Sequence, residues 1–239
     1  MIKRLVAIFL IISCFSPCFV SCGERKTDVR LGNVLIFGDS YSTYEGHIPD
    51  GYPTFYFDSV DYTDVNDVDE TWWSILASAC ESEIILNESY SGSTVSHTGY
   101  GGDCRSTSFI TRFERLLEEG YFDENRIDTV IILGGLNDYW ANAPLGEVKY
   151  GEISVEEQYS FLPALSYFLS LVKSTLPDAE IVFVVEEYIE GDMREGMLEI
   201  CGNLGVTAVT LTKISKVSSH PDEKGMRAIA NQIIDALED

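Results

Sequence analysis

The chain has 239 residues, a hydrophobic fraction of 45% and a mean hydropathy near zero, as is typical of one soluble globular domain with a sizeable core. Its formal net charge is −23 at pH 7. A surface of that sign repels phosphate groups, which argues against nucleic acid as a partner and makes an acidic polysaccharide a poor substrate.

The first 22 residues have the pattern of a bacterial lipoprotein signal. Lys3 and Arg4 precede an apolar run over residues 5–12, and the stretch ends at Ser21 and Cys22. The apolar run is too short for a lasting membrane span, and a small residue precedes the cleavage point, as in a secretory signal. The cysteine directly after Ser21 favours lipidation of Cys22 over an ordinary secretory signal.

We therefore predict three segments: a signal peptide over residues 1–21, a polar tether over 22–32 and one domain over 33–239. The protein would then be anchored by lipid in the bacterial cell envelope, at the outer membrane or the periplasmic face, with the membrane as a partner through Cys22.

The cysteines that would remain beyond Cys22 indicate neither a disulfide framework nor a zinc site. They are odd in number and widely spaced: Cys80, Cys104 and Cys201. We predict that they are buried free thiols.

The first predicted strand covers residues 33–37 and is followed by Gly38, Asp39 and Ser40. It is a short apolar run rich in β-branched residues, which is typical of a buried strand. A serine just beyond the first strand of an α/β chain lies where such folds place ligands. Gly, Asp and Ser are also common turn residues, and this stretch alone favours a plain turn.

A long segment over residues 41–70 has neither helical nor strand periodicity. A loop of this length in a compact domain is usually functional or disordered, and its many aromatic residues argue against disorder. They could form a wall for stacking sugars or a local core that fixes the loop, and we favour a local core with one or two rings facing a cleft. Five of its aspartates lack the spacing of a calcium loop and indicate a solvated acidic surface: Asp58, Asp61, Asp64, Asp67 and Asp69.

The rest of the chain alternates between helices and strands, which predicts a mostly parallel sheet covered on both faces. Thr71 is a predicted N-cap. The predicted helices cover residues 71–80, 106–119, 155–174 (kinked or split at Pro163), 192–203 and a last one that His220, Pro221 and Asp222 open. The further strands cover 83–86, 128–133, 181–185 and 206–211, and the second is followed by a loop of small residues over 87–94.

Four short blocks in this order resemble the SGNH hydrolase superfamily, also called GDSL esterases and lipases. They are Gly38-Asp39-Ser40, Gly92, Gly135-Leu136-Asn137-Asp138 and His220-Pro221. The resemblance covers about residues 33–237. It implies a three-layer α/β/α sandwich around a five-stranded, mainly parallel sheet, a flavodoxin-like fold, and a serine ester hydrolase with no metal or organic cofactor.

The roles that the resemblance implies agree with the chemistry of the side chains. A serine hydroxyl needs a base to take its proton, and a neutral histidine can do so near pH 7, which makes Ser40 the nucleophile and His220 the base. The backbone N–H groups of Ser40 and Gly92 and the side chain of Asn137 would form the oxyanion hole. We interpret Asp39 and Asp138 as supporting acids that hold their loops.

The sequence departs from the family at Val217, where the family usually has an aspartate three residues before the histidine. That aspartate orients the ring and stabilises its charged form. Either a backbone carbonyl holds His220 in a Ser–His dyad, which we favour, or an acid comes from elsewhere, with Glu186 and Glu187 as candidates.

We predict an esterase that removes a small acyl group, acetyl by preference, from a carbohydrate or a small ester. A second hypothesis is a lipase, thioesterase or lysophospholipase of the same superfamily. A third is a carbohydrate-binding lipoprotein that kept the fold and lost catalysis; the missing aspartate and the aromatic loop favour it, and the presence of all four name-giving residues argues against it.

Overall fold

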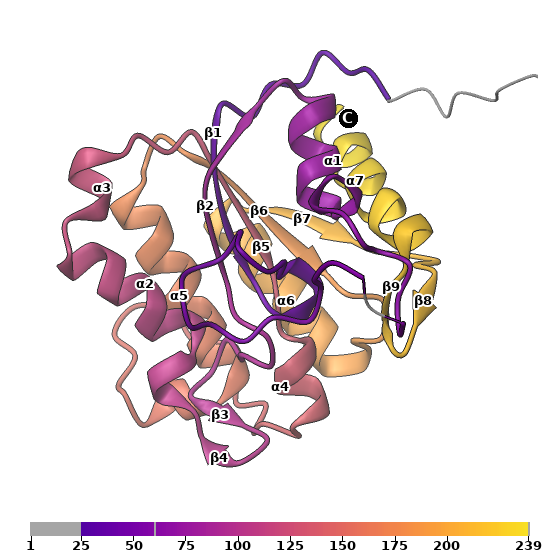
Figure 1. Ribbon diagram of the computed structural model, residues 1–239. Coiled ribbons are helices and arrows are strands. Elements are labelled where there is room, and N and C mark those ends of the chain that lie inside the picture. The colour runs from indigo at the N-terminus through magenta and orange to yellow at the C-terminus, as the bar shows by residue number, and fades with distance from the viewer. Residues whose placement is uncertain (1–24, 60, 239) are drawn as a thin grey trace, which may run out of the picture.

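The computed structural model of the protein describes residues 25–59 and 61–238 (Figure 1). The predicted signal peptide and the lipidation site Cys22 lie outside these residues. Within them, no helix combines the length and the apolar character that a membrane crossing requires.

The fold is built on a five-stranded sheet in the order β2-β1-β5-β6-β7, with every neighbouring pair parallel. This confirms the predicted sheet. Its central strands are nearly continuous apolar runs because both faces of the sheet are covered. The strands are β1 (Asn33–Gly38), β2 (Glu83–Ser89), β5 (Thr129–Leu133), β6 (Glu180–Val185) and β7 (Thr207–Thr210).

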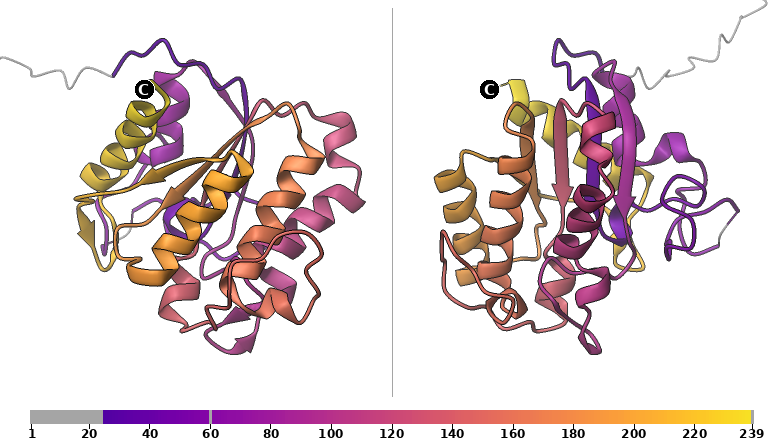
Figure 2. Two further views of the ribbon diagram at one scale, coloured as in Figure 1. Left: turned by 180° about the vertical axis from the view of Figure 1, so that it is seen from behind. Right: turned by 90° about the vertical axis from the view of Figure 1, so that its left-hand side faces the viewer.

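Helices cover both faces of this sheet and give the three-layer α/β/α sandwich (Figure 2). One face carries α1 (Trp72–Ala79) and α7 (Glu223–Glu238), which pack on each other. The other carries α2 (Phe109–Glu118), α5 (Phe161–Thr175) and α6 (Gly191–Leu204). On that side the ring of Phe37 in β1 lies within 6.1 Å, between ring centroids, of three phenylalanine rings from α2 and α5: Phe109, Phe113 and Phe168.

Shorter elements connect these layers. Two small hairpins are formed by β3 (Thr98–Gly99) with β4 (Gly102–Asp103) and by β8 (Lys216–Val217) with β9 (His220–Pro221). Two short helices are α3 (Tyr121–Glu124) and α4 (Leu136–Trp140). Single turns of 3-10 helix cover Ser40–Ser42, Val68–Glu70, Arg105–Thr107 and Glu157–Tyr159.

Four predicted boundaries were wrong. The helix expected from residue 106 begins at Phe109, after the 3-10 turn Arg105–Thr107. The strand β2 continues to Ser89, through residues expected in a loop, because its last three side chains are buried. The helix expected from residue 155 begins at Phe161, so that Pro163 lies in its first turn, where a missing N–H costs nothing. The last helix begins at Glu223, and Pro221 belongs to the β8–β9 hairpin.

Other local expectations are confirmed. The side chain of Thr71 accepts a hydrogen bond from the backbone N–H of Ser74 and caps α1. All three cysteines of the described chain are free thiols; Cys80 and Cys201 are buried and Cys104 is half-buried. The five aspartates predicted to form a solvated acidic surface are all exposed; among them, Asp58 also accepts a hydrogen bond from the hydroxyl of Tyr44 and Asp64 one from the backbone of Glu223.

Candidate active site

The sheet register brings three of the four motif blocks together at the carboxyl ends of the strands. Gly38 at the end of β1 pairs with Ser89 of β2 on one side and with Leu133 of β5 on the other. The loops that follow these three strands therefore start side by side, where the strand order reverses, and this is the place where α/β sheets bind ligands. Gly38 has to be a glycine, because a Cβ there would lie 2.6 Å from the hydroxyl of Ser89.

Ser40 and His220 lie within hydrogen-bond distance although 180 residues separate them. The Nε2 atom of His220 is 2.9 Å from Oγ of Ser40. Ser40 is at the start of a single 3-10 turn after β1 and is 8% exposed. This is the geometry in which a histidine can take the proton of an attacking hydroxyl.

A backbone carbonyl occupies the other ring nitrogen. Nδ1 of His220 is 3.0 Å from the carbonyl oxygen of Ser218, so Nδ1 carries the proton and donates it there, while Nε2 accepts from Ser40. Val217 pairs with His220 across the β8–β9 hairpin and contributes no acceptor. The turn between the two strands consists of Ser218 and Ser219, both at positive φ (49° and 65°).

The two glutamates considered as substitutes for the missing aspartate bind Lys216 instead. Its ammonium group is buried and forms ion pairs with Glu186 and with Glu187, the latter at 3.3 Å. These ion pairs connect the hairpin that carries His220 to the end of β6. The positive charge of Lys216 joins the burial of the ring in lowering the pKa of His220, while the bond to the Ser218 carbonyl opposes them.

The loops that follow β1, β2 and β5 carry backbone and side-chain N–H groups suited to an oxyanion hole. In the described part of the chain, no intramolecular hydrogen bond uses the backbone N–H of Ser40 or of Gly92. Asn137 donates one N–H to the carbonyl of Ser93 at 2.9 Å, which leaves its second N–H free. Gly92 has φ of +81°, and a Cβ there would meet nothing within 4 Å, so this position needs glycine for its backbone conformation and not for space.

The two supporting acids hold the loops that carry these donors. Asp138 accepts from the backbone N–H groups of Val95 and Ser96, each at 2.9 Å, and so fixes the loop after Gly92. Asp39 accepts from the backbone of Tyr41 at 3.0 Å and caps the turn of Ser40. Burial raises the pKa of Asp39 to about 7 and that of Asp138 to about 6.

Aromatic residues of the loop over residues 41–70 hold the His220 hairpin. The ring of Phe55 stacks on the imidazole with centroids 3.4 Å apart and planes 6° apart. The hydroxyl of Tyr41 donates to the carbonyl of Ser219 at 2.7 Å, and that of Tyr56 donates to the carbonyl of Pro221 at 2.8 Å. Tyr41 and Tyr56 are buried, so the local core that we predicted is present, and it holds the hairpin that carries His220.

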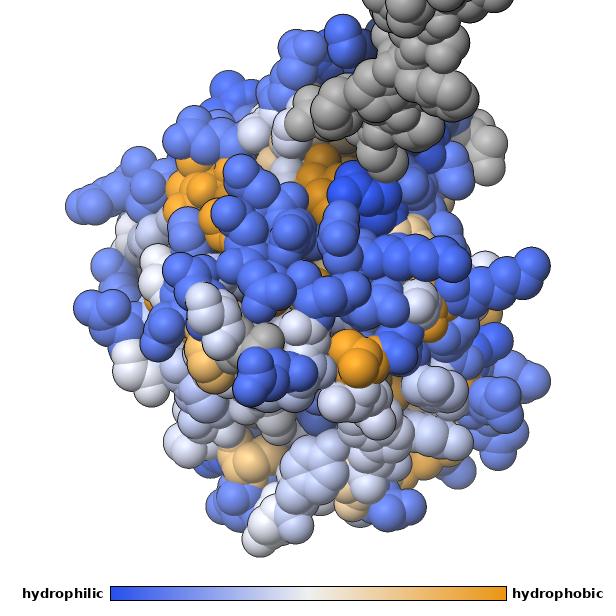
Figure 3. All heavy atoms as spheres, turned by 45° about the vertical axis from the view of Figure 1, so that its right-hand side comes forward, coloured by the Kyte–Doolittle hydropathy of each residue, from blue (hydrophilic) through white to orange (hydrophobic). Residues whose placement is uncertain are grey.

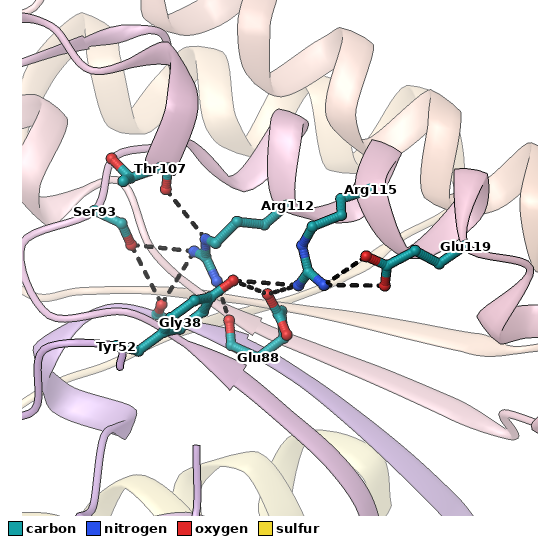
Figure 4. A network of polar contacts seen from close by, with 8 residues as sticks. All are labelled: Gly38, Tyr52, Glu88, Ser93, Thr107, Arg112, Arg115 and Glu119. Atoms are coloured by element: carbon teal, nitrogen blue, oxygen red, sulfur yellow. Dashed lines mark hydrogen bonds and ion pairs between the residues drawn. The ribbon is translucent and has the colours of Figure 1, made fainter. Parts of the chain in front are cut away.

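A buried arginine connects the ends of β1 and β2 with the loop after β2 (Figure 4). Arg112 of α2 is 2% exposed and donates to the carbonyls of Gly38 (3.5 Å) and Glu88 and to the hydroxyl of Ser93 (3.1 Å). Its guanidinium also lies 4.7 Å from the ring centroid of Phe109. Next to it, Arg115 bonds the Glu88 carboxylate at 2.7 Å.

Sequence reasoning missed Arg112, Lys216 and Tyr100, whose hydroxyl donates to Oδ1 of Asn137. The signal for Arg112 was present, since it is the one charged residue on the apolar face formed by Phe109, Ile110 and Phe113. No local pattern indicates Lys216 or Tyr100, because their partners lie more than 25 residues away.

Comparisons with known proteins agree with this geometry. The family model for GDSL-like lipase/acylhydrolase matches residues 32–237. A crystal structure of a GDSL-like lipase from Bacteroides ovatus ATCC 8483 is 35% identical with a TM-score of 0.81, covering 87% of this chain and 98% of that one. A second, from Bacteroides uniformis ATCC 8492, is 35% identical with a TM-score of 0.79, covering 87% and 95%.

More distant structures share the fold. An acetyl xylan esterase from the rumen bacterium Butyrivibrio proteoclasticus is 20% identical with a TM-score of 0.56, covering 89% of this chain and 64% of that one. Comparison with curated proteins gives no match. The match over nearly the whole described domain, together with the two 35% identical structures, shows that the chain belongs to the GDSL-like lipase/acylhydrolase family of the SGNH hydrolase superfamily and is an esterase-type hydrolase.

Proposed function

We propose that the protein removes a small acyl group, acetyl by preference, from a carbohydrate, with Ser40 as nucleophile and His220 as its base. The observation that carries the catalytic part is the 2.9 Å contact between Nε2 of His220 and Oγ of Ser40, with the Ser218 carbonyl on the other ring nitrogen. This pair performs acyl transfer without an aspartate, because the carbonyl fixes the tautomer and accepts from the charged ring.

The reaction follows from these contacts. His220 takes the hydroxyl proton as Oγ of Ser40 bonds to the ester carbonyl carbon, and the oxyanion accepts from the N–H groups of Ser40, Gly92 and Asn137. The tetrahedral adduct collapses, the C–O bond to the alcohol breaks, and the imidazolium gives its proton to the leaving oxygen. Water, deprotonated by the same imidazole, then attacks the acyl-serine, and the acid leaves with Ser40 restored.

Other observations, on the surface and the fold, support the proposed carbohydrate substrate. The face of the molecule with α7 and the β8–β9 hairpin is mostly hydrophilic, with apolar residues in small separate groups (Figure 3). Tyr100 and Tyr188 are 60% and 49% exposed; one bonds Asn137 and the other lies against Lys216, so flat rings are available at the site. The fold is shared with an acetyl xylan esterase. Together these favour a polar alcohol such as a sugar over a long acyl chain.

The test is hydrolysis of para-nitrophenyl esters from acetate to octanoate and release of acetate from acetylated xylo-oligosaccharides, with Ser40→Ala and His220→Ala alongside. We expect activity that decreases with chain length, acetate release from the oligosaccharides, and a loss of about a thousandfold or more in both variants at an unchanged melting temperature. Activity that increases with chain length would support the lipase hypothesis. Glycan binding with no Ser40-dependent hydrolysis would support the non-catalytic one.

We further propose that Cys22 carries a lipid that anchors the enzyme in the cell envelope. The support is the sequence pattern of residues 1–22 alone. Metabolic labelling with a fatty-acid analogue should mark the wild-type protein and leave Cys22→Ser unmarked. Equal labelling of both would refute the anchor.

A further inference from the structure

Tyr100 lies at the tip of the β3–β4 hairpin and contacts the side chain assigned to the oxyanion hole. Its hydroxyl donates to Oδ1 of Asn137 at 2.9 Å, while its ring is 60% exposed. An exposed tyrosine normally bonds to water, so a direct bond to this amide needs an explanation.

The bond fixes the orientation of the Asn137 amide. One N–H of that amide donates to the carbonyl of Ser93, and Oδ1 accepts from Tyr100, so two of its polar groups are bonded on opposite sides. Because the amide is planar, these two bonds set the direction of the remaining N–H. A hydrogen bond to Oδ1 also polarises the amide and strengthens its N–H groups as donors.

The hydroxyl of Tyr100 is a donor over the working pH range. Burial of the hydroxyl raises the pKa of Tyr100, and the negative charges of Asp39 and Asp138 raise it further. The phenol therefore stays protonated at neutral and mildly alkaline pH.

We propose that Tyr100 has two roles in the proposed deacetylation, on which this inference rests: its hydroxyl positions Asn137 for the oxyanion, and its exposed ring is a wall against which the sugar of the substrate stacks. The hydroxyl is a positioning group, and the ring contacts substrate. The two roles belong to different atoms of one side chain and are separable by substitution.

Tyr100→Phe tests the hydroxyl. With para-nitrophenyl acetate we expect kcat to decrease about tenfold with KM within about twofold of wild type, less than the hundredfold or more typical of losing a whole oxyanion donor. In the background of Asn137→Ala the same substitution should change kcat by less than about twofold, because it acts through that amide. Tyr100→Phe at wild-type kcat, or an equal effect in both backgrounds, would overturn the positioning role.

Tyr100→Ala tests the ring. Relative to Tyr100→Phe we expect KM for acetylated xylo-oligosaccharides to increase about fivefold or more, with KM for para-nitrophenyl acetate unchanged within about twofold. An equal change in KM for both esters, or no change in KM for either, would contradict stacking of the sugar on the ring.

Tyr150→Phe is the matched control. Tyr150 is also exposed, and its hydroxyl accepts from the amide of Asn203 in the last turn of α6. That turn precedes the amino end of β7, whereas Ser40 follows the carboxyl end of β1 in the same parallel sheet. It should behave as wild type. Ser40→Ala separates this proposal from the proposed function: if the wild-type protein hydrolyses neither ester, or Ser40→Ala retains activity, the proposed function fails and this proposal fails with it.

Discussion

At the scale of single residues, the environment of His220 sets the pKa of the proposed base. Phe55 covers one face of its ring, the Ser218 carbonyl accepts from Nδ1, and the nearby charge of Lys216 disfavours protonation. Burial and that charge together lower the pKa of His220 below its ordinary 6.5. The imidazole is therefore neutral, and able to accept the Ser40 proton, at neutral pH.

The first prediction is the pH dependence of this base. Since only neutral His220 can accept the serine proton, kcat/KM should increase with pH on a single acid limb with a midpoint below 6.5 and be flat from about pH 7 upward. Initial rates on para-nitrophenyl acetate from about pH 4.5 to 8.5, corrected for spontaneous hydrolysis, measure it. Melting temperatures at each pH control for unfolding. A midpoint above 6.5 would contradict the assigned environment.

At the scale of elements, the β8–β9 hairpin positions His220 at a conformational cost. Ser218 and Ser219 both have positive φ, which a two-residue hairpin of this type requires and which serine adopts with strain. The strain is supported by partners outside the hairpin: Tyr41 and Tyr56 bond its carbonyls, and Lys216 connects it to β6.

Relief of that strain is the second prediction. Ser219→Gly should raise the free energy of unfolding by about 0.5–1 kcal/mol, because glycine adopts positive φ freely, and should leave kcat within about twofold. Ser219 acts at the site through its backbone carbonyl, which the substitution retains. Ser174→Gly, at an exposed position in helix α5, is the control and should lower stability by a similar amount. Urea unfolding measures both, and a loss of stability in Ser219→Gly would refute the strain.

The third prediction concerns Arg112. Lysine cannot reproduce the planar set of donors that reaches Gly38, Glu88 and Ser93 (Figure 4). Arg112→Lys should lower the free energy of unfolding by about 2–3 kcal/mol, because buried acceptors are left unbonded. It should also lower kcat by about tenfold, because the end of β1 before Ser40 and the loop that carries Gly92 lose their shared support.

Arg115→Lys is the control from the same network. Arg115 is 40% exposed and bonds three side chains, those of Glu88, Glu119 and Tyr52. It should change stability by less than about 1 kcal/mol and leave kcat unchanged. Equal effects of the two substitutions on kcat would show that Arg112 has no particular role in the site.

The sequence predicted the elements well where the pattern was local. The strands β1, β5 and β6 and the Thr71 cap rest on short-range periodicity and capping chemistry, and the structure has them within a residue or two. The errors had tertiary causes. Residues 87–89 are polar yet extend β2 because they are buried beside β1, and His220-Pro221 resembles a helix start yet pairs with Lys216-Val217.

The residues of the candidate site also fall into two groups, those that local motifs indicated and those that depend on tertiary contacts. The motifs indicated Ser40, Gly92, Asn137 and His220, and the register explains how three of them meet. Partners that act through space were not readable: the hydroxyl of Tyr100 on Asn137 and the stacking of Phe55 on His220 depend on loop conformations that no local pattern encodes.

At the scale of the whole molecule, the charge of −23 and two buried acids give stability a pH dependence. Asp39 has a pKa of about 7 in the folded protein against an ordinary 3.8. Between these values the unfolded chain releases this proton while the folded protein keeps it, so the free energy of unfolding decreases as pH increases through the window. Asp138, with a pKa of about 6, acts in the same direction.

Asp39→Asn isolates this effect and is the fourth prediction. Asparagine retains an oxygen for the Tyr41 N–H but has no proton to release. The free energy of unfolding of the variant should be compared with that of wild type at about pH 4 and at about pH 7.5. Between these two pH values the difference should change in favour of the variant by about 1 kcal/mol or more. General charge repulsion cancels in this difference, because it changes with pH almost equally in both proteins.

The control is Asp178→Asn, which removes an exposed carboxylate and should differ from wild type in stability by an amount that is independent of pH. Parallel stability curves for wild type and Asp39→Asn, measured by urea unfolding, would mean that the pKa of Asp39 is not raised in the folded protein, and that the loop of Ser40 holds a buried negative charge at neutral pH.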